Sequence, residues 1–173
     1  MHSAAYEFVA RTLRRIGRRR RVLELGSRDV NGSARSLFVE TEEYVGVDWR
    51  DGPGVDVIAD AGKWRPKKAR QFDCVVSTEC LEHAPDGAAI CRTAQAALVA
   101  GGVFILTAAG PAREPHGVDG TPVGGEFYAN VHPADLQAWL APFGFWTIEL
   151  GRGEQDIYAV AVAVKAFDPS GQL

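Results

Sequence analysis

The feature that most constrains the fold is the segment 22–32, VLELGSRDVNG, taken together with the segment 44–48, YVGVD. The first is an apolar run that carries an acid, Glu24, and ends at Gly26, after which a polar loop follows. The second is an apolar run that ends in Asp48. In parallel sheets, a glycine turn after one strand lets the backbone approach a ligand, and an acid ending the next strand accepts hydrogen bonds from ribose hydroxyls. The two segments therefore predict parallel strands with a nucleoside-bearing ligand across their carboxyl ends.

Further apolar runs continue this pattern along the chain. Residues 61–71 contain Pro66, so we expect a loop or a single turn there. Strands that are apolar almost throughout, alternating with helical segments, imply a parallel sheet covered on both faces. The expected strands are residues 21–25, 44–48, 55–59, 72–77 and 102–107, and the helix-compatible stretches are residues 33–40 and 87–99.

A helix is expected within residues 1–20, before the first strand. Ser3 is a suitable cap for its start, and Gly17 a suitable residue for its end. Four apolar residues of this segment recur at helical spacing: Tyr6, Val9, Leu13 and Ile16.

The last third of the chain follows a different plan. Residues 110–131 are rich in glycine and proline and predict a long loop with a functional role at the active site. A helix is expected at residues 133–141, with Pro133 in its first turn. The strand-like runs 143–150 and 156–164 are joined by a short connection, so they must pair antiparallel.

Composition limits the class of protein. The chain has 173 residues, 46% of them hydrophobic, so we expect one domain over residues 1–173. A net charge of −3 gives no basic field for nucleic acid. The three cysteines lack a CxxC spacing, and Cys80 with His83 offers too few ligands for a structural zinc site, so no metal is expected. Reduced thiols, the lack of a membrane-length apolar segment and the lack of a signal peptide favour a cytoplasmic protein with no membrane partner.

Four ordered segments, VLELGS, YVGVD, VIADA and FDCVVSTECLEHAPD, followed by GGVFILT, resemble the class I S-adenosylmethionine-dependent methyltransferases, including their small type 11-like members. That family typically begins E/D-x-G-x-G-x-G. Here Arg28 stands at the second glycine position, and Gly32 lies beyond the third. The resemblance implies a Rossmann-like, doubly wound α/β fold whose mostly parallel, seven-stranded sheet ends in an antiparallel hairpin. It also implies S-adenosylmethionine as cofactor.

For the methionine end of that cofactor, the resemblance implies a set of contacts from the first and fourth strands. Glu24 would organise the glycine loop and approach the ammonium group, and Gly26, followed by Ser27, would give the backbone close access. Ser77 and Thr78, where the fourth strand ends, would face the methionine.

For the nucleoside end, the resemblance implies contacts from the second and third strands. Asp48 would take the ribose hydroxyls, and Trp49 would stack against adenine. Asp60 would accept a hydrogen bond from the adenine amino group, with Ala61 beside it.

The residues that face the methyl acceptor are less marked in the sequence. His83, in an LEH signature, is the candidate general base, and it can equally hold its loop together through hydrogen bonds to the backbone. Glu79 on the same loop is a second candidate, and His116, Tyr128 and His132 lie in or beside the long loop. We expect a small molecule that offers an oxygen, nitrogen or carbon nucleophile, and dimerisation of the chain would complete more of the pocket.

Two other classes of function stay open at this point. An NAD-type oxidoreductase would need the close-approach glycines of GxGxxG, but the turn reads GSRDVNG. A non-catalytic module that binds cofactor or a partner would keep the fold without turnover. DNA is disfavoured as a substrate, because the fourth strand ends in STEC, without N/D-P-P-Y/F or a Pro-Cys nucleophile.

Overall fold

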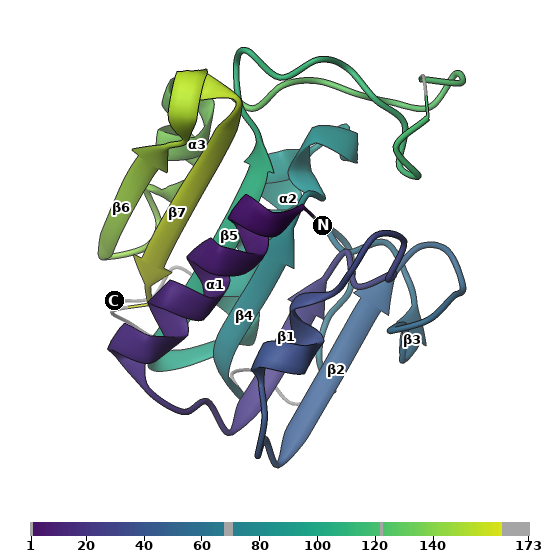
Figure 1. Ribbon diagram of the computed structural model, residues 1–173. Coiled ribbons are helices and arrows are strands. Elements are labelled where there is room, and N and C mark those ends of the chain that lie inside the picture. The colour runs from purple at the N-terminus through teal and green to yellow at the C-terminus, as the bar shows by residue number, and fades with distance from the viewer. Residues whose placement is uncertain (1, 68–70, 122, 164–173) are drawn as a thin grey trace.

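The computed structural model describes residues 2–67, 71–121 and 123–163. In these residues seven strands form one sheet of order β3-β2-β1-β4-β5-β7-β6 (Figure 1). The strands β1 to β5 are parallel, and β7 lies antiparallel between β5 and β6. The expected fold class is therefore confirmed. The bounds of the strands are β1 Arg21–Leu25, β2 Glu43–Asp48, β3 Val57–Ile58, β4 Phe72–Thr78, β5 Leu98–Ala109, β6 Phe145–Leu150 and β7 Asp156–Val162.

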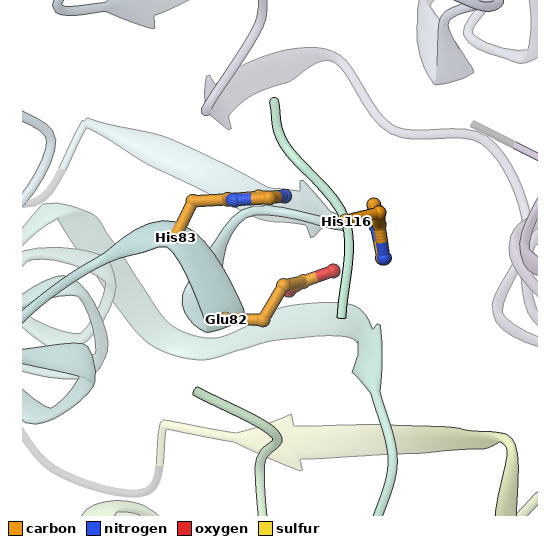
Figure 2. Close-up of side chains that lie close together, drawn as sticks. All are labelled: Glu82, His83 and His116. Carbon is orange, nitrogen blue, oxygen red and sulfur yellow. The ribbon is translucent and has the colours of Figure 1, made fainter. Parts of the chain in front are cut away.

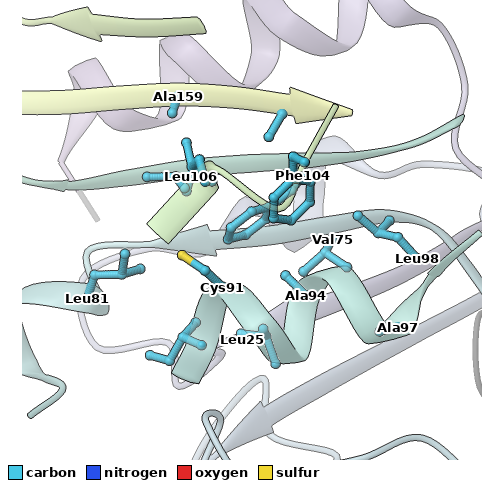
Figure 3. Packing of buried hydrophobic residues seen from close by; sticks show 14 of the residues in the cluster. Leu25, Val75, Leu81, Cys91, Ala94, Ala97, Leu98, Phe104, Leu106 and Ala159 are labelled. Atoms are coloured by element: carbon cyan, nitrogen blue, oxygen red, sulfur yellow. The ribbon is translucent and has the colours of Figure 1, made fainter. Parts of the chain in front are cut away.

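Helices cover both faces of the sheet, as a doubly wound fold requires. α1 (Ser3–Ile16) crosses one face, and α2 (Gly87–Ala97) and α3 (Pro133–Leu140) lie on the other (Figure 1). Because successive residues of a strand point to opposite faces, the apolar runs feed two cores. In β5, Phe104 packs on the α2 and α3 side (Figure 3), and Ile105 packs on the α1 side.

α1 ends where the sequence predicts and begins differently. Gly17 has a φ of 77°, and its N–H donates to the Leu13 carbonyl oxygen at 2.8 Å, which confirms it as the end of the helix. Ser3 is not the cap, because the helix already includes it and His2 takes the capping position without a side-chain hydrogen bond. Tyr6, Val9, Leu13 and Ile16 all lie in the helix, with Tyr6 36% exposed. The buried residues of α1 are Ala5, Phe8, Val9 and Thr12.

The connections on the β2–β3 side are shorter than expected. Residues 33–40 form only the 3-10 turn Ala34–Leu37, and residues 55–59 form a strand only at Val57–Ile58. Between β2 and β3 a long crossover is unnecessary, because after β2 the chain returns along that strand only as far as Gly46. There the Asp56 N–H donates to the Gly46 carbonyl at 2.8 Å, and the Asp56 carboxylate accepts from the Gly46 N–H at 2.7 Å. In the expected loop 61–71, residues 68–70 lie outside the described residues.

The end of the chain matches its expected plan. α2 runs directly into β5, which is longer than predicted and begins at Leu98. The final strands pair antiparallel, from Phe145 opposite Val162 to Leu150 opposite Ile157, and residue 164 of the expected strand lies outside the described residues. None of the helices in the described part of the chain is long and apolar enough to cross a membrane.

Phe104→Ala tests the core on the α2 side. The Phe104 ring is fully buried, and its centroid lies 5.9 Å from that of Phe143. Its loss leaves a cavity, so we expect the free energy of unfolding to fall by about 3–5 kcal/mol. Urea denaturation followed by circular dichroism measures this. Phe145→Ala is the control, because that ring is 61% exposed, and a loss of similar size there would contradict the assignment.

Candidate active site

A cavity of about 680 Å³ lies where β1, β2 and β4 end at the same edge of the sheet. The order of strands reverses between β1 and β4, which is the position where open α/β sheets bind ligands. Its volume is that of a small-molecule site. The β1 and β2 turns, the end of β4, the following 3-10 turn Leu81–His83 and the long loop before α3 all contribute to its wall.

The turn after β1 depends on Gly26. This residue has a φ of 80°, and the N–H groups of Gly26 and Ser27 both donate to the Val47 carbonyl oxygen, at 2.9 and 3.1 Å. A Cβ at position 26 would lie 2.5 Å from the Cys80 sulfur. A side chain is excluded both by the backbone conformation and by this contact. The glycine therefore brings the β1 turn against the loop after β4, and Gly26, Ser27 and Cys80 all line the cavity.

Glu24 also lines the cavity, although only 2% of it is exposed. The Tyr44 hydroxyl donates to its Oε2 at 2.9 Å. Burial raises the pKa of Glu24 to about 7, against the opposing effect of the Tyr44 hydrogen bond. A carboxyl group in this state ionises readily when a cation comes to lie beside it.

Asp48 presents its carboxylate to the cavity from the end of β2. The Arg28 N–H donates to Oδ2 at 3.2 Å and the Arg50 N–H donates to Oδ1 at 3.0 Å, so the group is held by backbone. Trp49 follows it, 59% exposed and lining the cavity, with the Arg50 guanidinium 4.2 Å from the ring centroid. Arg28, which stands at the second glycine position of the family motif, thus contributes to the site through its main-chain N–H.

Asp60 and Ala61 line the same end of the cavity from the segment after β3. The Gly62 N–H donates to Asp60 Oδ1 at 2.9 Å, and the Lys63 ammonium lies 3.0 Å from Oδ2. Burial works to raise the pKa of Asp60, but the hydrogen bonds from Lys63 and Gly62 outweigh it and lower the pKa. The carboxylate is therefore ionised at neutral pH and can accept hydrogen bonds.

At the end of β4 the structure separates two residues that the sequence placed together. Thr78 lines the cavity. Ser77 is fully buried, and its hydroxyl donates to the Leu25 carbonyl at 2.8 Å, so it joins β4 to β1 instead of facing a ligand. This corrects the expectation for Ser77. The cause is the alternation of side chains along a strand, which turns only one of two neighbours toward the cavity.

Glu79 follows in an unusual conformation. Its φ is 51°, in the left-handed region that side chains rarely adopt, and its N–H donates to the Thr107 carbonyl at 2.9 Å. The Thr107 hydroxyl donates to Oε1 at 2.8 Å, and His2 Nε2 lies 3.2 Å from Oε2. Burial works to raise the pKa of Glu79, but the contact with His2 outweighs it and lowers the pKa.

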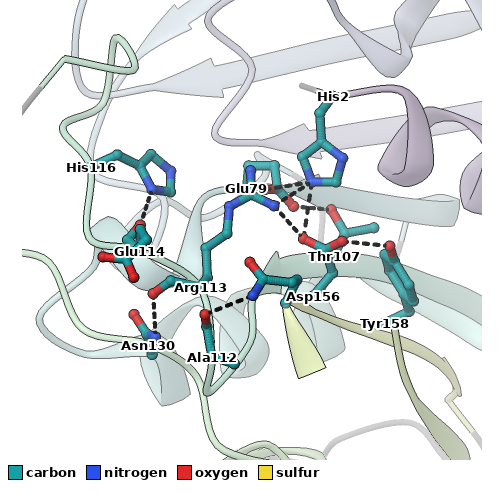
Figure 4. Close-up of polar contacts among 11 residues, drawn as sticks. His2, Glu79, Thr107, Ala112, Arg113, Glu114, His116, Asn130, Asp156 and Tyr158 are labelled. Carbon is teal, nitrogen blue, oxygen red and sulfur yellow. Dashed lines mark hydrogen bonds and ion pairs between the residues drawn. The ribbon is translucent and has the colours of Figure 1, made fainter. Parts of the chain in front are cut away.

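A polar network that the sequence did not reveal surrounds Glu79 (Figure 4). Asp156 Oδ1 lies 3.1 Å from His2 Nε2 and 2.7 Å from Arg113 Nη1. The Tyr158 hydroxyl donates to Asp156 Oδ2 at 3.0 Å. The Glu79 contact raises the pKa of His2, while burial opposes the rise. His2 and Arg113 both line the cavity. Only the antiparallel register, which sets Asp156 opposite Ala109 at the end of β5, could have indicated this cluster.

His83 and His116 line the same cavity as Glu24 and Asp48. Tyr128 packs against both imidazole rings. The His83 ring centroid lies 5.4 Å from that of His116 and 5.5 Å from that of Tyr128. Burial, then the neighbouring His116, lowers the pKa of His83. Tyr128 is outside the cavity wall, and burial raises its pKa to about 12. His132 is exposed at the start of α3 and does not line the cavity, which corrects the expectation of an acceptor contact there.

The long loop before α3 is fixed over the cavity by polar contacts. The Asn130 side-chain amide donates to the carbonyls of Pro111 and Arg113, at 3.1 and 2.8 Å, and so joins the two legs of the loop. Glu126 Oε2 lies 3.4 Å from the guanidinium of Arg50, which follows β2. The loop supplies several lining residues: Arg113, His116, Gly117, Val118, Gly120, Glu126 and Phe127.

Solved structures of methyltransferases share this fold. A Burkholderia thailandensis 1,6-didemethyltoxoflavin-N1-methyltransferase with bound 1,6-didemethyltoxoflavin and S-adenosylhomocysteine is 16% identical with a TM-score of 0.66, covering 94% of this chain and 79% of that one. The N-methyltransferase NodS from Bradyrhizobium japonicum, in complex with S-adenosylhomocysteine, is 12% identical with a TM-score of 0.68, covering 94% and 87%. A Thermus thermophilus 16S rRNA methyltransferase is 15% identical with a TM-score of 0.62, covering 99% of this chain and 42% of that one.

A search of curated protein sequences gave no match. The model of one protein family, described as a methyltransferase domain, matches residues 1–150. That span includes the β1 turn, Asp48, the end of β4 and the long loop, all of which line the cavity. The chain belongs to this methyltransferase family.

Proposed function

We propose that the cavity binds S-adenosylmethionine at its Glu24 and Asp48 end and admits a small-molecule methyl acceptor at its His83 and His116 end. The observation that carries the proposal is the continuity of the cavity, since one space of about 680 Å³ is lined by all four residues. A donor site and an acceptor site must meet in one enclosed space for a methyl group to pass between them.

The residues present fit the cofactor. Glu24 offers a buried carboxyl group to an ammonium, and Asp48 offers a carboxylate, fixed by backbone, to a pair of hydroxyls. The Ser27 hydroxyl is buried without a hydrogen-bond partner among the described residues, which suits a bound polar ligand. We assign the adenine to Trp49, Asp60 and Ala61, and the methionine to Glu24, Gly26 and Thr78.

When bound, S-adenosylmethionine supplies a methyl group that its sulfonium already activates, so the protein has little covalent chemistry to perform. The side chains hold the acceptor in line and exclude water. His83 is the group we assign to removal of the acceptor's proton, because its lowered pKa leaves the ring neutral and able to accept a proton at neutral pH.

A small-molecule acceptor is favoured by the charge and closure of the acceptor end. Glu79, His2 and Arg113 line the wall there, and Glu79 is paired with His2, so that wall offers paired charges and no continuous basic surface for a phosphodiester backbone. The long loop and His2 both contribute to the wall. The Thermus thermophilus neighbour is named for ribosomal RNA, so the fold by itself does not select the acceptor.

The proposal is tested by calorimetry with S-adenosylmethionine, followed by mass spectrometry for S-adenosylhomocysteine in the presence of cell-extract metabolites. Binding with turnover supports an enzyme. Binding without turnover in any extract would favour a non-catalytic module, and no binding would overturn the cofactor assignment. An NAD-type oxidoreductase is disfavoured by the family, and titration with NADH provides the corresponding check.

Asp48→Asn is expected to weaken the binding of S-adenosylmethionine by roughly ten- to a hundredfold, because a hydrogen bond to a charged acceptor contributes about 1.5–3 kcal/mol. Asn keeps the shape of the side chain and one of its two acceptor atoms. Asp51→Asn is the matched control on the same loop, since Asp51 is exposed and does not line the cavity. Equal affinities for the two variants in calorimetry would refute the ribose assignment.

The pKa of Glu24 predicts how cofactor affinity depends on pH. An ammonium binds the ionised carboxylate, and with a pKa of about 7 that form grows about tenfold between pH 6 and pH 8. Affinity measured by calorimetry should therefore rise by about tenfold over that range. Glu24→Gln should bind weakly and lack this Glu24-dependent rise.

The stability of the free protein should change in the opposite direction with pH. The folded state keeps the Glu24 proton that the unfolded state releases above its ordinary pKa of 4.5. The contribution of Glu24 to the free energy of unfolding therefore falls as pH rises from 4.5 to about 7. Urea denaturation across this range shows it, and Glu24→Gln should flatten the curve. An unchanged curve in that variant would assign the pH dependence to another group.

A further inference from the structure

The side chains of Glu82, His83 and His116 lie close together at the proposed acceptor end. A general base needs only one of them. Glu82 and His83 belong to the 3-10 turn Leu81–His83, and His116 comes from the long loop. Each offers one ligand atom, and these atoms all lie within 4.8 Å of one another. Figure 2 shows the Glu82 carboxylate directed toward the space between the two imidazole rings.

The buried polar atoms of this cluster have no hydrogen-bond partner of good geometry among the described residues, although backbone groups of Glu82 and Ala109 lie near the Glu82 carboxyl and the Phe127 backbone lies near His83. Among the described residues, five buried side-chain atoms have no hydrogen-bond partner, and four of them lie here: both carboxylate oxygens of Glu82, Nδ1 of His83 and the Tyr128 hydroxyl. The fifth is the Ser27 hydroxyl in the cofactor end. Glu82 is 0% exposed. A carboxylate buried in this way is costly unless a cation or a hydrogen-bond donor meets it.

A second group of one histidine and two acids differs from this one in its hydrogen bonds. The ligand atoms of His2, Glu79 and Asp156 also lie within 4.8 Å of one another. There the carboxylates already have donors, since Arg113 and the Tyr158 hydroxyl contact Asp156, and the Thr107 hydroxyl donates to Glu79. Both carboxylates of that group therefore accept hydrogen bonds from side chains. The Glu82 carboxyl has no such side-chain donor among the described residues.

We propose that Glu82, His83 and His116 bind a divalent transition-metal ion in the wall of the cavity. One carboxylate and two imidazoles form a set that Zn²⁺, Mn²⁺, Fe²⁺, Co²⁺ and Ni²⁺ accept, whereas Mg²⁺ and Ca²⁺ prefer oxygen alone. Three protein ligands leave coordination positions open. Because His83 and His116 line the cavity, those positions face the acceptor.

Backbone contacts already fix the ligands in place. His116 Nδ1 lies 3.1 Å from the Glu114 carbonyl oxygen, and a hydrogen bond there leaves Nε2 with its lone pair. Imidazoles that bind metals commonly donate their second nitrogen in this way. The Ala129 N–H donates to the Glu82 carbonyl at 2.8 Å, which ties the loop carrying His116 to the turn carrying Glu82.

The ion extends the proposed function, on which this step rests, by selecting an acceptor with a hydroxyl group. A hydroxyl oxygen bound to the ion has a lowered pKa, so its O–H bond breaks with the proton passing to water. An oxygen lone pair then forms the bond to the methyl carbon, while the electron pair of the breaking C–S bond stays on sulfur. With the ion bound, His83 is a ligand in place of the base assigned to it above, because the ion itself promotes loss of the proton.

Titration of chelator-treated protein with Co²⁺ tests the site without any substrate, through visible absorption and calorimetry. We expect one strong site per chain. Glu82→Gln and His116→Ala should each weaken it by at least about a hundredfold, in line with the loss of one of three ligands. His132→Ala and His2→Ala are the controls, the first an exposed histidine off the cavity, the second a member of the group with Glu79 and Asp156. Both should retain the affinity of the wild type.

Thermal unfolding keeps the test decisive if a variant binds weakly because it is unstable. Co²⁺ should raise the melting temperature of the wild type and of His132→Ala, and leave that of Glu82→Gln unchanged. Glu82→Gln replaces a buried carboxyl group by an amide of the same shape and so should fold about as well as the wild type without metal. No cobalt binding by the wild type, unchanged binding by Glu82→Gln, or loss confined to His2→Ala would each overturn the proposal.

Calorimetry with S-adenosylmethionine on the same variants separates this inference from the proposed function. His116→Ala should retain cofactor affinity while losing cobalt. If the wild type binds cobalt but not S-adenosylmethionine, the function fails and the metal site stands. If it binds the cofactor but not cobalt, the metal site fails and His83 keeps its role as base.

Discussion

The contact between Gly26 and Cys80 is the constraint on which the site depends. It lets the turn after β1 rest directly against the loop after β4, where a side chain of any size at position 26 would meet the sulfur. The β1 turn carries the main-chain groups that orient Asp48, and the β4 exit leads to Glu79, Glu82 and His83. One close approach thus brings the β1 turn and the β4 exit into the wall of a single cavity. The missing second glycine matters less, because Arg28 acts there through its N–H.

Two buried acids, Glu24 and Glu82, differ in their hydrogen-bond donors and in how far burial raises their pKa values. Glu24 has a tyrosine hydroxyl as donor and a pKa near neutrality, so it can stay protonated until a cationic ligand arrives. Glu82 has no side-chain donor among the described residues, and burial followed by the charge of Glu79 raises its pKa well above the ordinary value, against the opposing effect of backbone hydrogen bonds. Both arrangements cost stability in the free protein and recover it when a positive charge binds. Under the two proposals, these buried carboxyl groups are the positions at which a bound cation would be held.

The sequence predicted the parts of the fold that depend on local pattern. Apolar runs gave the strands, Gly17 gave the end of α1, and the short connection before Asp156 gave the antiparallel hairpin. It could not predict that the β1–β2 crossover contains only one 3-10 turn, or that β3 has only two residues, because an apolar pattern does not fix how a connection returns along the neighbouring strand.

The same limit applies to the site. Glu24, Asp48 and Thr78 line the cavity, as their places at strand ends indicated. Ser77 does not, because it is one residue before Thr78 and its side chain points to the other face of the strand. The contacts of His2 with Asp156 and of Glu82 with His116 join segments far apart in the chain. No spacing in the sequence encodes them.

The two-residue strand β3 has a consequence for how the cavity fills. Only Val57 and Ile58 pair with β2, so the segment that carries Asp60 and Ala61 is held to the sheet by a minimal ladder. Segments with few main-chain bonds open locally at a small fraction of the global unfolding free energy. The wall formed by Asp60 and Ala61 therefore has a shorter strand ladder behind it than the wall that rests on β4 and β5 in the centre of the sheet. A ligand that bridges Asp48 and Asp60 would join the segment after β3 to the end of β2. Ligand binding would therefore also increase the local order of β3.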